Sequence, residues 1–387
     1  MKALRKYLDK VKPNFQKGGK YEFLHSTFDA FETFLFVPDK VTNRGSHIRD
    51  GVDMKRTMIV VVLALVPALL FGMWNTGYQH ALSIGESWSF WQTFFFGFIK
   101  VLPIIVVSYV VGLGIEFAFA QYRHHEVNEG FLVSGMLIPL IVPVDVPLWM
   151  VALATAFAVV IGKEVFGGTG MNVFNPALTA RAFLFFAYPS YMSGDKVWVE
   201  GLMKGTRIVD GFSGATPLAK AAAYEKLPSA YDMFMGFIPG SIGETSTLAI
   251  LLGAAILIIT GIGSWKIIAS TFAGGLVMGL ILNAFAVNPF MEIPAYYHLI
   301  MGGFAFGAVF MATDPVTATQ TSRGKWIYGF LIGVFAVLVR VLNPAYPEGM
   351  MLSILLMNAF APLIDHYVVQ ANVNRRLKRA AVAAKTK

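Results

Sequence analysis

The sequence predicts an all-α polytopic membrane protein of about ten transmembrane helices, arranged as two inverted five-helix repeats. Of its 387 residues, 56% are hydrophobic and only 14% are charged, whereas a soluble globular chain is about 25% charged. Basic residues gather at the two ends, because twelve of the 31 Lys and Arg precede Thr57 and six follow Gln370. Cytoplasmic segments of membrane proteins are enriched in Lys and Arg, so both termini are predicted to be cytoplasmic.

The elements follow in order from the apolar segments. Residues 1–56 are predicted to form a basic, aromatic cytoplasmic extension that lies on the bilayer, covers a quinone-sized entrance or packs on a partner. A first membrane repeat is expected at 57–188, a polar outer loop at 189–247, a second repeat at 248–369 and a basic cytoplasmic tail at 370–387. The ten apolar segments lie near Met58–Trp74, Trp91–Ala120, Phe131–Val142, Leu148–Phe166, Phe174–Tyr188, Leu248–Thr260, Ile267–Ala286, His298–Ala312, Trp326–Leu342 and Met351–Val369. Several of them are short for a full span and are interpreted as broken helices.

The two membrane repeats are predicted from an echo within the chain. Gly130-Phe131, a proline-rich break and Leu148-Trp149 recur in outline as Gly303-Phe304, a break at Asp314-Pro315 and Lys325-Trp326. Five segments per half is an odd number, so the second repeat would be inverted in the membrane. Transporters with this plan bind their ligands at broken helices between the repeats.

Several classes of function find no support in the composition and motifs. The chain has no cysteine, and its histidines show no metal-ligand spacing, so no metal site is predicted. No Gly-Lys-Ser/Thr phosphate loop occurs, which argues against ATP-driven transport. The net charge of +8 follows from the basic ends and does not indicate nucleic acid as a partner.

A glycine-rich interruption at 167–176 carries two asparagines, Asn172 and Asn175. Glycines allow a ligand to approach the backbone closely, and asparagine side chains both donate and accept hydrogen bonds. The segment is therefore interpreted either as a tight re-entrant turn or as a ligand site.

Ionisable residues within apolar segments are the other candidates for a site, because charges at membrane depth mark ion or ligand pathways. The competing interpretation is an interfacial position or an internal ion pair, and it is favoured for Lys163 and Glu164, which lie near a segment end from which they could snorkel. Na⁺ prefers oxygen ligands, which carboxylates and broken-helix carbonyls provide. The other residues of this kind are Glu116, Arg181, Asp314, Arg340 and Asp365.

Thr216 lies in the polar 189–247 loop, before Pro217 and an alanine-rich run. This order predicts a helix N-cap, a proline at the first helical position and a first helical turn. A threonine hydroxyl there either caps the helix or carries a phosphate ester.

The loop motif and strings along almost the whole chain carry a family resemblance. Asp210-Gly211-Phe212-Ser213-Gly214-Ala215-Thr216 resembles the flavin-transferase acceptor pattern Asp-x-x-Ser/Thr-Gly-Ala-Thr. Further strings are Lys163–Gly170, Asn175–Leu178, Pro239–Glu244, Met311–Pro315 and Asn343–Met350. Together they resemble the family of the B-type membrane subunit of the Na⁺-translocating NADH:quinone reductase and, more distantly, the D-type subunit of the Rnf ferredoxin:NAD⁺ complex.

The resemblance implies a subunit of the bacterial inner membrane that passes electrons from covalent FMN through noncovalent riboflavin to ubiquinone or menaquinone, coupled to Na⁺ translocation. It implies other subunits as partners and a flavin transferase for maturation. Thr216 would carry FMN within the motif formed with Asp210, Ser213, Gly214 and Ala215. By the same resemblance, Asn172 and Asn175 would contact riboflavin; Gly112, Leu113 and Glu116 would belong to a quinone site; and Glu116, Asp314 and Asp365 are Na⁺ candidates.

Two alternatives stay open at this point. An Rnf-type subunit would work with partners that deliver ferredoxin electrons. A cofactor-free secondary transporter of the inverted-repeat type would explain the topology and the buried acids, but it would not explain the acceptor motif.

Overall fold

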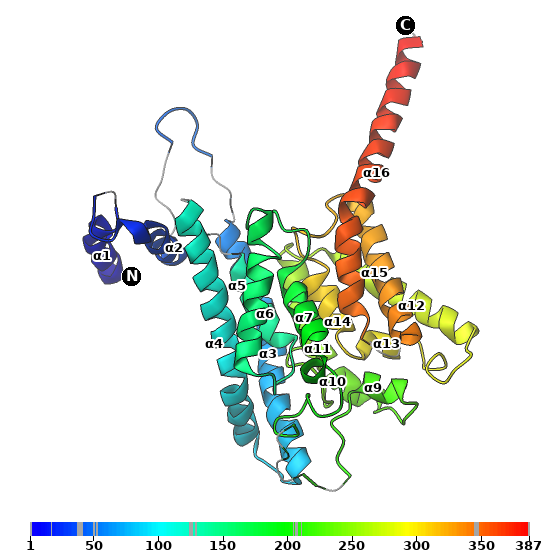
Figure 1. Ribbon diagram of the computed structural model, residues 1–387. Helices are drawn as coiled ribbons and strands as arrows, with labels where there is room; N and C mark the ends of the chain where they lie inside the picture. Colours follow the sequence, from blue (N-terminus) through cyan, green and yellow to red (C-terminus); the bar gives the residue numbers. More distant parts are fainter. Residues whose placement is uncertain are drawn as a thin grey trace.

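The computed structural model describes residues 2–16, 18–36, 42–48, 51, 53–123, 127, 130–203, 205, 208–209, 211–343 and 348–385. All regular structure within these ranges is helical, as predicted (Figure 1). The elements are α1 (Lys2–Val11), η1 (Lys12–Asn14), η2 (Glu22–Leu24), α2 (His25–Leu35), α3 (Met54–Ile84), α4 (Phe90–Arg123), α5 (Phe131–Leu140), α6 (Leu148–Val160), η3 (Glu164–Phe166), α7 (Pro176–Ala187), α8 (Pro189–Met192), α9 (Pro217–Ala222), α10 (Ala230–Met235), α11 (Thr247–Ile259), α12 (Trp265–Ala284), α13 (Tyr297–Ile300), α14 (Phe304–Phe306), the π-helical η4 (Gly307–Met311), α15 (Ser322–Leu342) and α16 (Met350–Lys385).

Six segments in the described part of the chain are long and apolar enough to cross a bilayer. Their most apolar stretches have mean hydropathies from 1.5 to 2.4. The chain is therefore a multi-pass membrane protein. The six are α3, α4, α6 together with η3, α12, α15 and α16.

Other apolar helices are too short to span the membrane alone. Helix α5 has ten residues, about 15 Å at 1.5 Å per residue, against a hydrocarbon core of about 30 Å. The chain after α5 stays buried, and the carbonyl of Leu140, the last residue of α5, accepts from Gly243 N at 2.7 Å. Irregular backbone at membrane depth is tolerated where protein satisfies it in this way.

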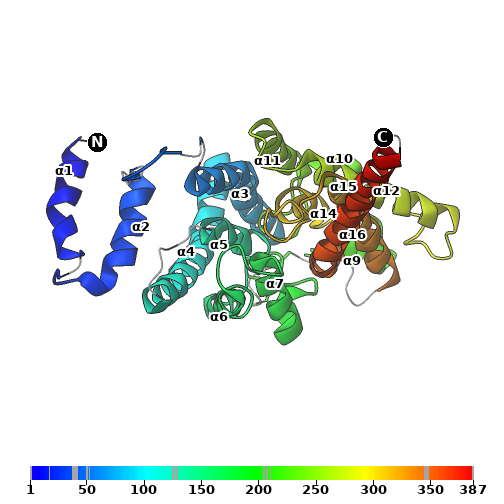
Figure 2. The ribbon, with the colours of Figure 1, turned by 90° about the horizontal axis from the view of Figure 1, so that it is seen from above.

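Glycines let the long helices approach closely. A Cβ added at Gly97 of α4 would lie 1.7 Å from the carbonyl oxygen of Met73 in α3, and one at Gly274 of α12 would lie 2.1 Å from that of Phe330 in α15. Small residues at such crossings are typical of helix packing in membranes. The pairs α3–α4 and α12–α15 form the centres of two helix groups, which meet where α11 packs on α3 and α16 on α7 (Figure 2).

The N-terminal helices and the end of α16 lie toward the same end of the molecule (Figure 1). Helix α2 packs beside the end of α4, where the rings of Phe31 and Phe117 meet and Gln121 donates to Thr27 at 3.2 Å. Helix α16 continues beyond the bundle as an exposed basic helix. Helices α9 and α10 lie at the opposite end (Figure 1).

Candidate cofactor sites

Thr216 is the N-cap of α9, and Pro217 is its first residue, as the sequence predicts. The Thr216 side chain accepts a hydrogen bond from Ala219 N at 3.2 Å. This hydrogen bond holds the hydroxyl in one direction. Because the residue is only half-buried, a ligand can still reach it.

The loop before Thr216 explains two further positions of the acceptor motif. A Cβ at Gly214 would lie 2.3 Å from the carbonyl oxygen of Asp195, so only glycine fits there. Ser213 Oγ accepts from Ala215 N at 3.2 Å, and Ala215 is buried. Asp210, the first residue of the predicted motif, lies outside the described residues.

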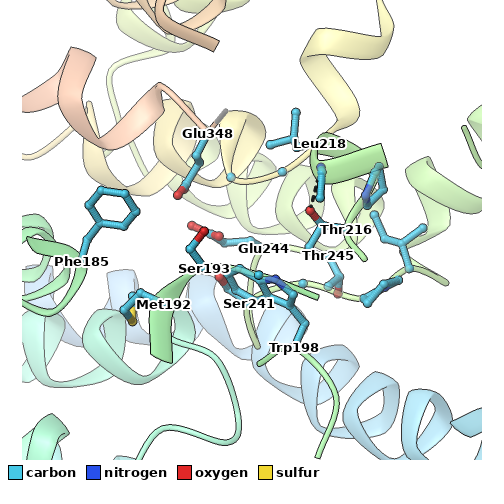
Figure 3. Close-up of a pocket in the computed structure, with 18 of the residues that line it drawn as sticks. Phe185, Met192, Ser193, Trp198, Thr216, Leu218, Ser241, Glu244, Thr245 and Glu348 are labelled. Carbon is cyan, nitrogen blue, oxygen red and sulfur yellow. Dashed lines mark hydrogen bonds between the residues drawn. The ribbon is translucent and has the colours of Figure 1, made fainter. Parts of the chain in front are cut away.

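Thr216 opens onto a cavity with about 770 Å³ of empty space, its mouth included (Figure 3). Small-molecule sites are lined mainly by apolar and aromatic groups with a few polar ones. The aromatic lining here comes from Phe185 of α7 and from Trp198. Three charged residues also line the cavity. Arg181 Nη1 lies 2.5 Å from Glu244 Oε1, and Arg181 Nη2 lies 2.8 Å from Glu348 Oε2.

A second cavity, with about 810 Å³ of empty space, is lined by Asn172 and Asn175. Helix α7 runs from Asn175 in this cavity to Phe185 in the first, about 15 Å along its axis. Asn175 is the N-cap of α7: its Oδ1 accepts from Ala177 N and Leu178 N, while its Nδ2 donates to Asp314 Oδ2 at 3.3 Å.

Buried ion pairs confirm one form of the interpretation favoured for Lys163 and Glu164, internal ion pairing, and contradict the other, an interfacial position. Lys163 and Glu164 do not snorkel, because they are only 3% and 4% exposed. Lys163 Nζ forms an ion pair with Glu116 of α4, and Glu164 pairs with Arg123 at 3.1 Å. Both acids and Lys163 find their partners on a neighbouring helix or turn, so no side chain has to reach the membrane surface.

The residues predicted for a quinone site lie together on α4 but line neither cavity. A Cβ at Gly112 would lie 1.9 Å from Cζ of the buried Phe131 ring, so this glycine brings α4 onto α5. Leu113 packs against the core at the same level. Glu116, one turn further, pairs with Lys163, which lines the second cavity.

The three carboxylates predicted as Na⁺ candidates have separate surroundings. Asp314 lines the second cavity and also accepts from Val316 N at 3.1 Å and Thr317 Oγ1 at 3.0 Å. Asp365 accepts from the backbone N–H groups of Gln320 and Thr321, which fastens α16 to the turn before α15. Across the described ranges, no three His, Cys, Asp or Glu side chains gather closely enough to hold a metal ion.

Glu244, Glu348 and Trp198 of the first cavity are not among the site residues that the sequence predicts. The two acids belong to strings that the sequence does single out, Pro239–Glu244 and Asn343–Met350. The first string leads into α11 and the second into α16. Both helices begin at the end of the molecule where Thr216 lies. Nothing in the sequence singles out Trp198.

Fold and cavities define a multi-pass helical membrane protein with cavities at opposite ends of its bundle. Residues 41–374 match the model of the NQR2, RnfD, RnfE family, and the chain belongs to this family. Curated relatives described as the B-type subunit of Na(+)-translocating NADH-quinone reductase match over nearly their full length. The protein of Ectopseudomonas mendocina (strain ymp) is 51% identical over 408 aligned positions, 97% of this chain and 99% of the relative. The protein of Chromohalobacter salexigens is 50% identical over 98% of this chain and 97% of the relative. The protein of Azotobacter vinelandii is 49% identical over 97% of this chain and 99% of the relative.

Proposed function

We propose that this chain is the membrane redox subunit of a Na⁺-pumping NADH:quinone oxidoreductase and carries FMN on Thr216 through a phosphoester bond. The observation that carries this proposal is the Thr216 hydroxyl, held at the edge of a cavity with aromatic side chains in its wall. The relatives described as B-type subunits of such reductases support it.

The residues around Thr216 fit a covalently held flavin. Gly214 keeps the backbone tight against Asp195 and leaves the hydroxyl at the cavity edge, where a flavin transferase can reach it. Trp198 and Phe185 offer aromatic surface to a planar ring, and Arg181 offers a cation. FMN, when bound, supplies the electron-transfer chemistry, while the chain sets its position and electrostatic surroundings.

The second cavity is the proposed site of noncovalent riboflavin. Asn172 and Asn175 line it, and their amides suit the polar edge of a flavin ring. The quinone site would use Gly112, Leu113 and Glu116 beside α2, and Na⁺ handling would use Glu116, Asp314 and Asp365. The flavins would pass electrons between the two ends of the bundle to ubiquinone or menaquinone.

Ten membrane crossings in two inverted repeats, 57–188 and 248–369, are also proposed. Helix α3 begins at the second cavity and α11 at the first, so the halves start at opposite ends. Corresponding helices pack alike: α4 on α6 and α6 on α7 in the first half, α12 on α15 and α15 on α16 in the second. The crossings α5 and α14–η4 would be broken helices.

In this proposed topology both termini would lie on the cytoplasmic side of a bacterial inner membrane. The 189–247 loop and Thr216 would lie on its outer side. The sequence contains no dinucleotide-binding fingerprint, so NADH oxidation is assigned to another subunit of the complex. A cofactor-free transporter would instead move its substrate in liposomes that contain this chain alone without flavin.

Peptide mass spectrometry tests the proposal directly. The complex is produced in cells that contain the flavin transferase, and the peptide spanning Gly211–Lys220 is analysed after digestion. We expect this peptide to carry the mass of FMN less one water, because ester formation expels water, with the modification on Thr216. An unmodified peptide from such cells would overturn the assignment.

Asn175→Ala is expected to remove noncovalent riboflavin and to leave FMN on Thr216. The variant loses the cap of α7, which is worth about 0.5–2 kcal/mol, together with an amide that lines the second cavity. Extracted riboflavin is measured per mole of covalent FMN. Ser246→Ala is the matched control, since Ser246 caps α11 in the same way but lines neither cavity. Equal riboflavin loss in both variants would refute a direct role for Asn175.

A further inference from the structure

The cavity beside Thr216 contains polar groups that the anchoring of a phosphate does not use. Arg181 comes from α7, Ser241, Glu244 and Thr245 come from the turn before α11, and Glu348 precedes α16. Figure 3 draws Ser241, Glu244, Thr245 and Glu348 around the same space as Thr216. Three segments far apart in the sequence therefore contribute to one polar wall.

Thr245 is the unexplained member of this wall. The residue is 4% exposed, and its Oγ1 is buried without a hydrogen-bond partner among the described residues. Its methyl group lies on the side of Gly240, where an added Cβ would be 3.1 Å from Cγ2. An unsatisfied buried hydroxyl costs about 1–3 kcal/mol, so a ligand that pairs with Thr245 would account for its presence in the cavity wall.

Arg181 brings a guanidinium into the same wall, where Glu244 and Glu348 pair with it. It is 4% exposed, and its position is determined by Glu244, by Glu348 and by Ser241 Oγ at 3.4 Å. The two carboxylates and the guanidinium form a charged network. A single isosteric substitution in this network changes its net charge by one elementary charge. In a poorly solvated site such a change acts strongly on any nearby redox group.

We propose that Thr245 hydrogen-bonds to the polar pyrimidine edge of an isoalloxazine ring anchored through Thr216, and that Arg181 lies beside that edge and raises its reduction potential. The inference rests on the proposed function. Two-electron reduction with uptake of one proton leaves the ring with one negative charge, which a neighbouring cation stabilises. The electrons come from the NADH-oxidising part of the complex, and Thr245 and Arg181 are positioning residues.

Thr245→Val and Thr245→Ser form the first test, measured by spectroelectrochemical titration of the covalent flavin in the assembled complex. Both variants are expected to keep the fluorescent flavin band on denaturing gels. Valine replaces the hydroxyl with a methyl group and is expected to shift the flavin absorption and to change the reduced-to-oxidised ratio about tenfold, or about 30 mV for a two-electron couple. Serine should behave as wild type. A valine variant with an unchanged potential and spectrum would overturn the proposal, even though the band confirmed FMN on Thr216.

The second test uses the sign of the charge. Arg181→Met is expected to lower the flavin potential, and Glu244→Gln to raise it, because one removes a positive charge and the other a negative charge. If Arg181→Met does not assemble, Glu244→Gln still decides the direction. Shifts that vanish when Na⁺ is replaced by K⁺ would mean that the wall binds a cation instead, and would overturn the proposal. Loss of the flavin band in wild type would instead refute the proposed function.

Discussion

Thr216→Ala is expected to abolish the covalent flavin of this chain completely. Only a hydroxyl can form the phosphoester, and at this position of the cavity edge the hydroxyl belongs to Thr216. Wild-type protein should give a fluorescent band on a denaturing gel, whereas the alanine variant should give a protein band without fluorescence. NADH-driven quinone reduction by the assembled complex should fall to background with it.

Two matched variants separate the loss of the ester from the loss of the helix cap. Removing an N-cap costs about 0.5–2 kcal/mol, so alanine also weakens α9. Thr216→Asn keeps a capping acceptor but has no hydroxyl, and it should be as dark as alanine while melting close to wild type. Thr216→Ser keeps both and should retain the band. A fluorescent asparagine variant would mean that another residue carries the flavin.

The membrane helices are predictable because their apolar character is a local property of the sequence. Their ends are less so, as α3 illustrates: the apolar segment predicts an end near Trp74, yet the helix continues to Ile84. The added turns carry polar residues that other parts of the chain satisfy. Asn75 donates to Ile238 O at 2.9 Å, and a ring nitrogen of His80 lies 2.9 Å from Glu200 O. Hydropathy alone cannot anticipate partners that far away.

The same distinction holds for the cavity beside Thr216. The cap is predictable, since Thr216, Pro217 and the alanine run are adjacent. The ion pairs are not, because Arg181 and Glu244 are separated by 63 positions and meet only in the folded bundle. For Lys163 the sequence leaves an interfacial position and an internal ion pair open for the same reason, because its partner Glu116 belongs to another helix.

Lys163→Met is expected to destabilise the protein by about 3–5 kcal/mol, because it leaves the Glu116 carboxylate buried without its cation. Both side chains are 4% exposed, so water cannot replace the lost partner. The melting temperature of the purified complex in detergent, and the yield of assembled complex, measure the effect. The double variant Glu116→Gln with Lys163→Met removes both charges and should recover much of the stability, since neither residue then carries an unpaired buried charge.

Asp9→Asn provides the control for losing one partner of an exposed ion pair. Asp9 pairs with Arg5 at 2.9 Å, and their side chains are 52% and 31% exposed. Exposed pairs contribute about 0–1 kcal/mol, so this variant should melt near wild type. A Lys163→Met variant as stable as Asp9→Asn would contradict this account of the buried ion pair.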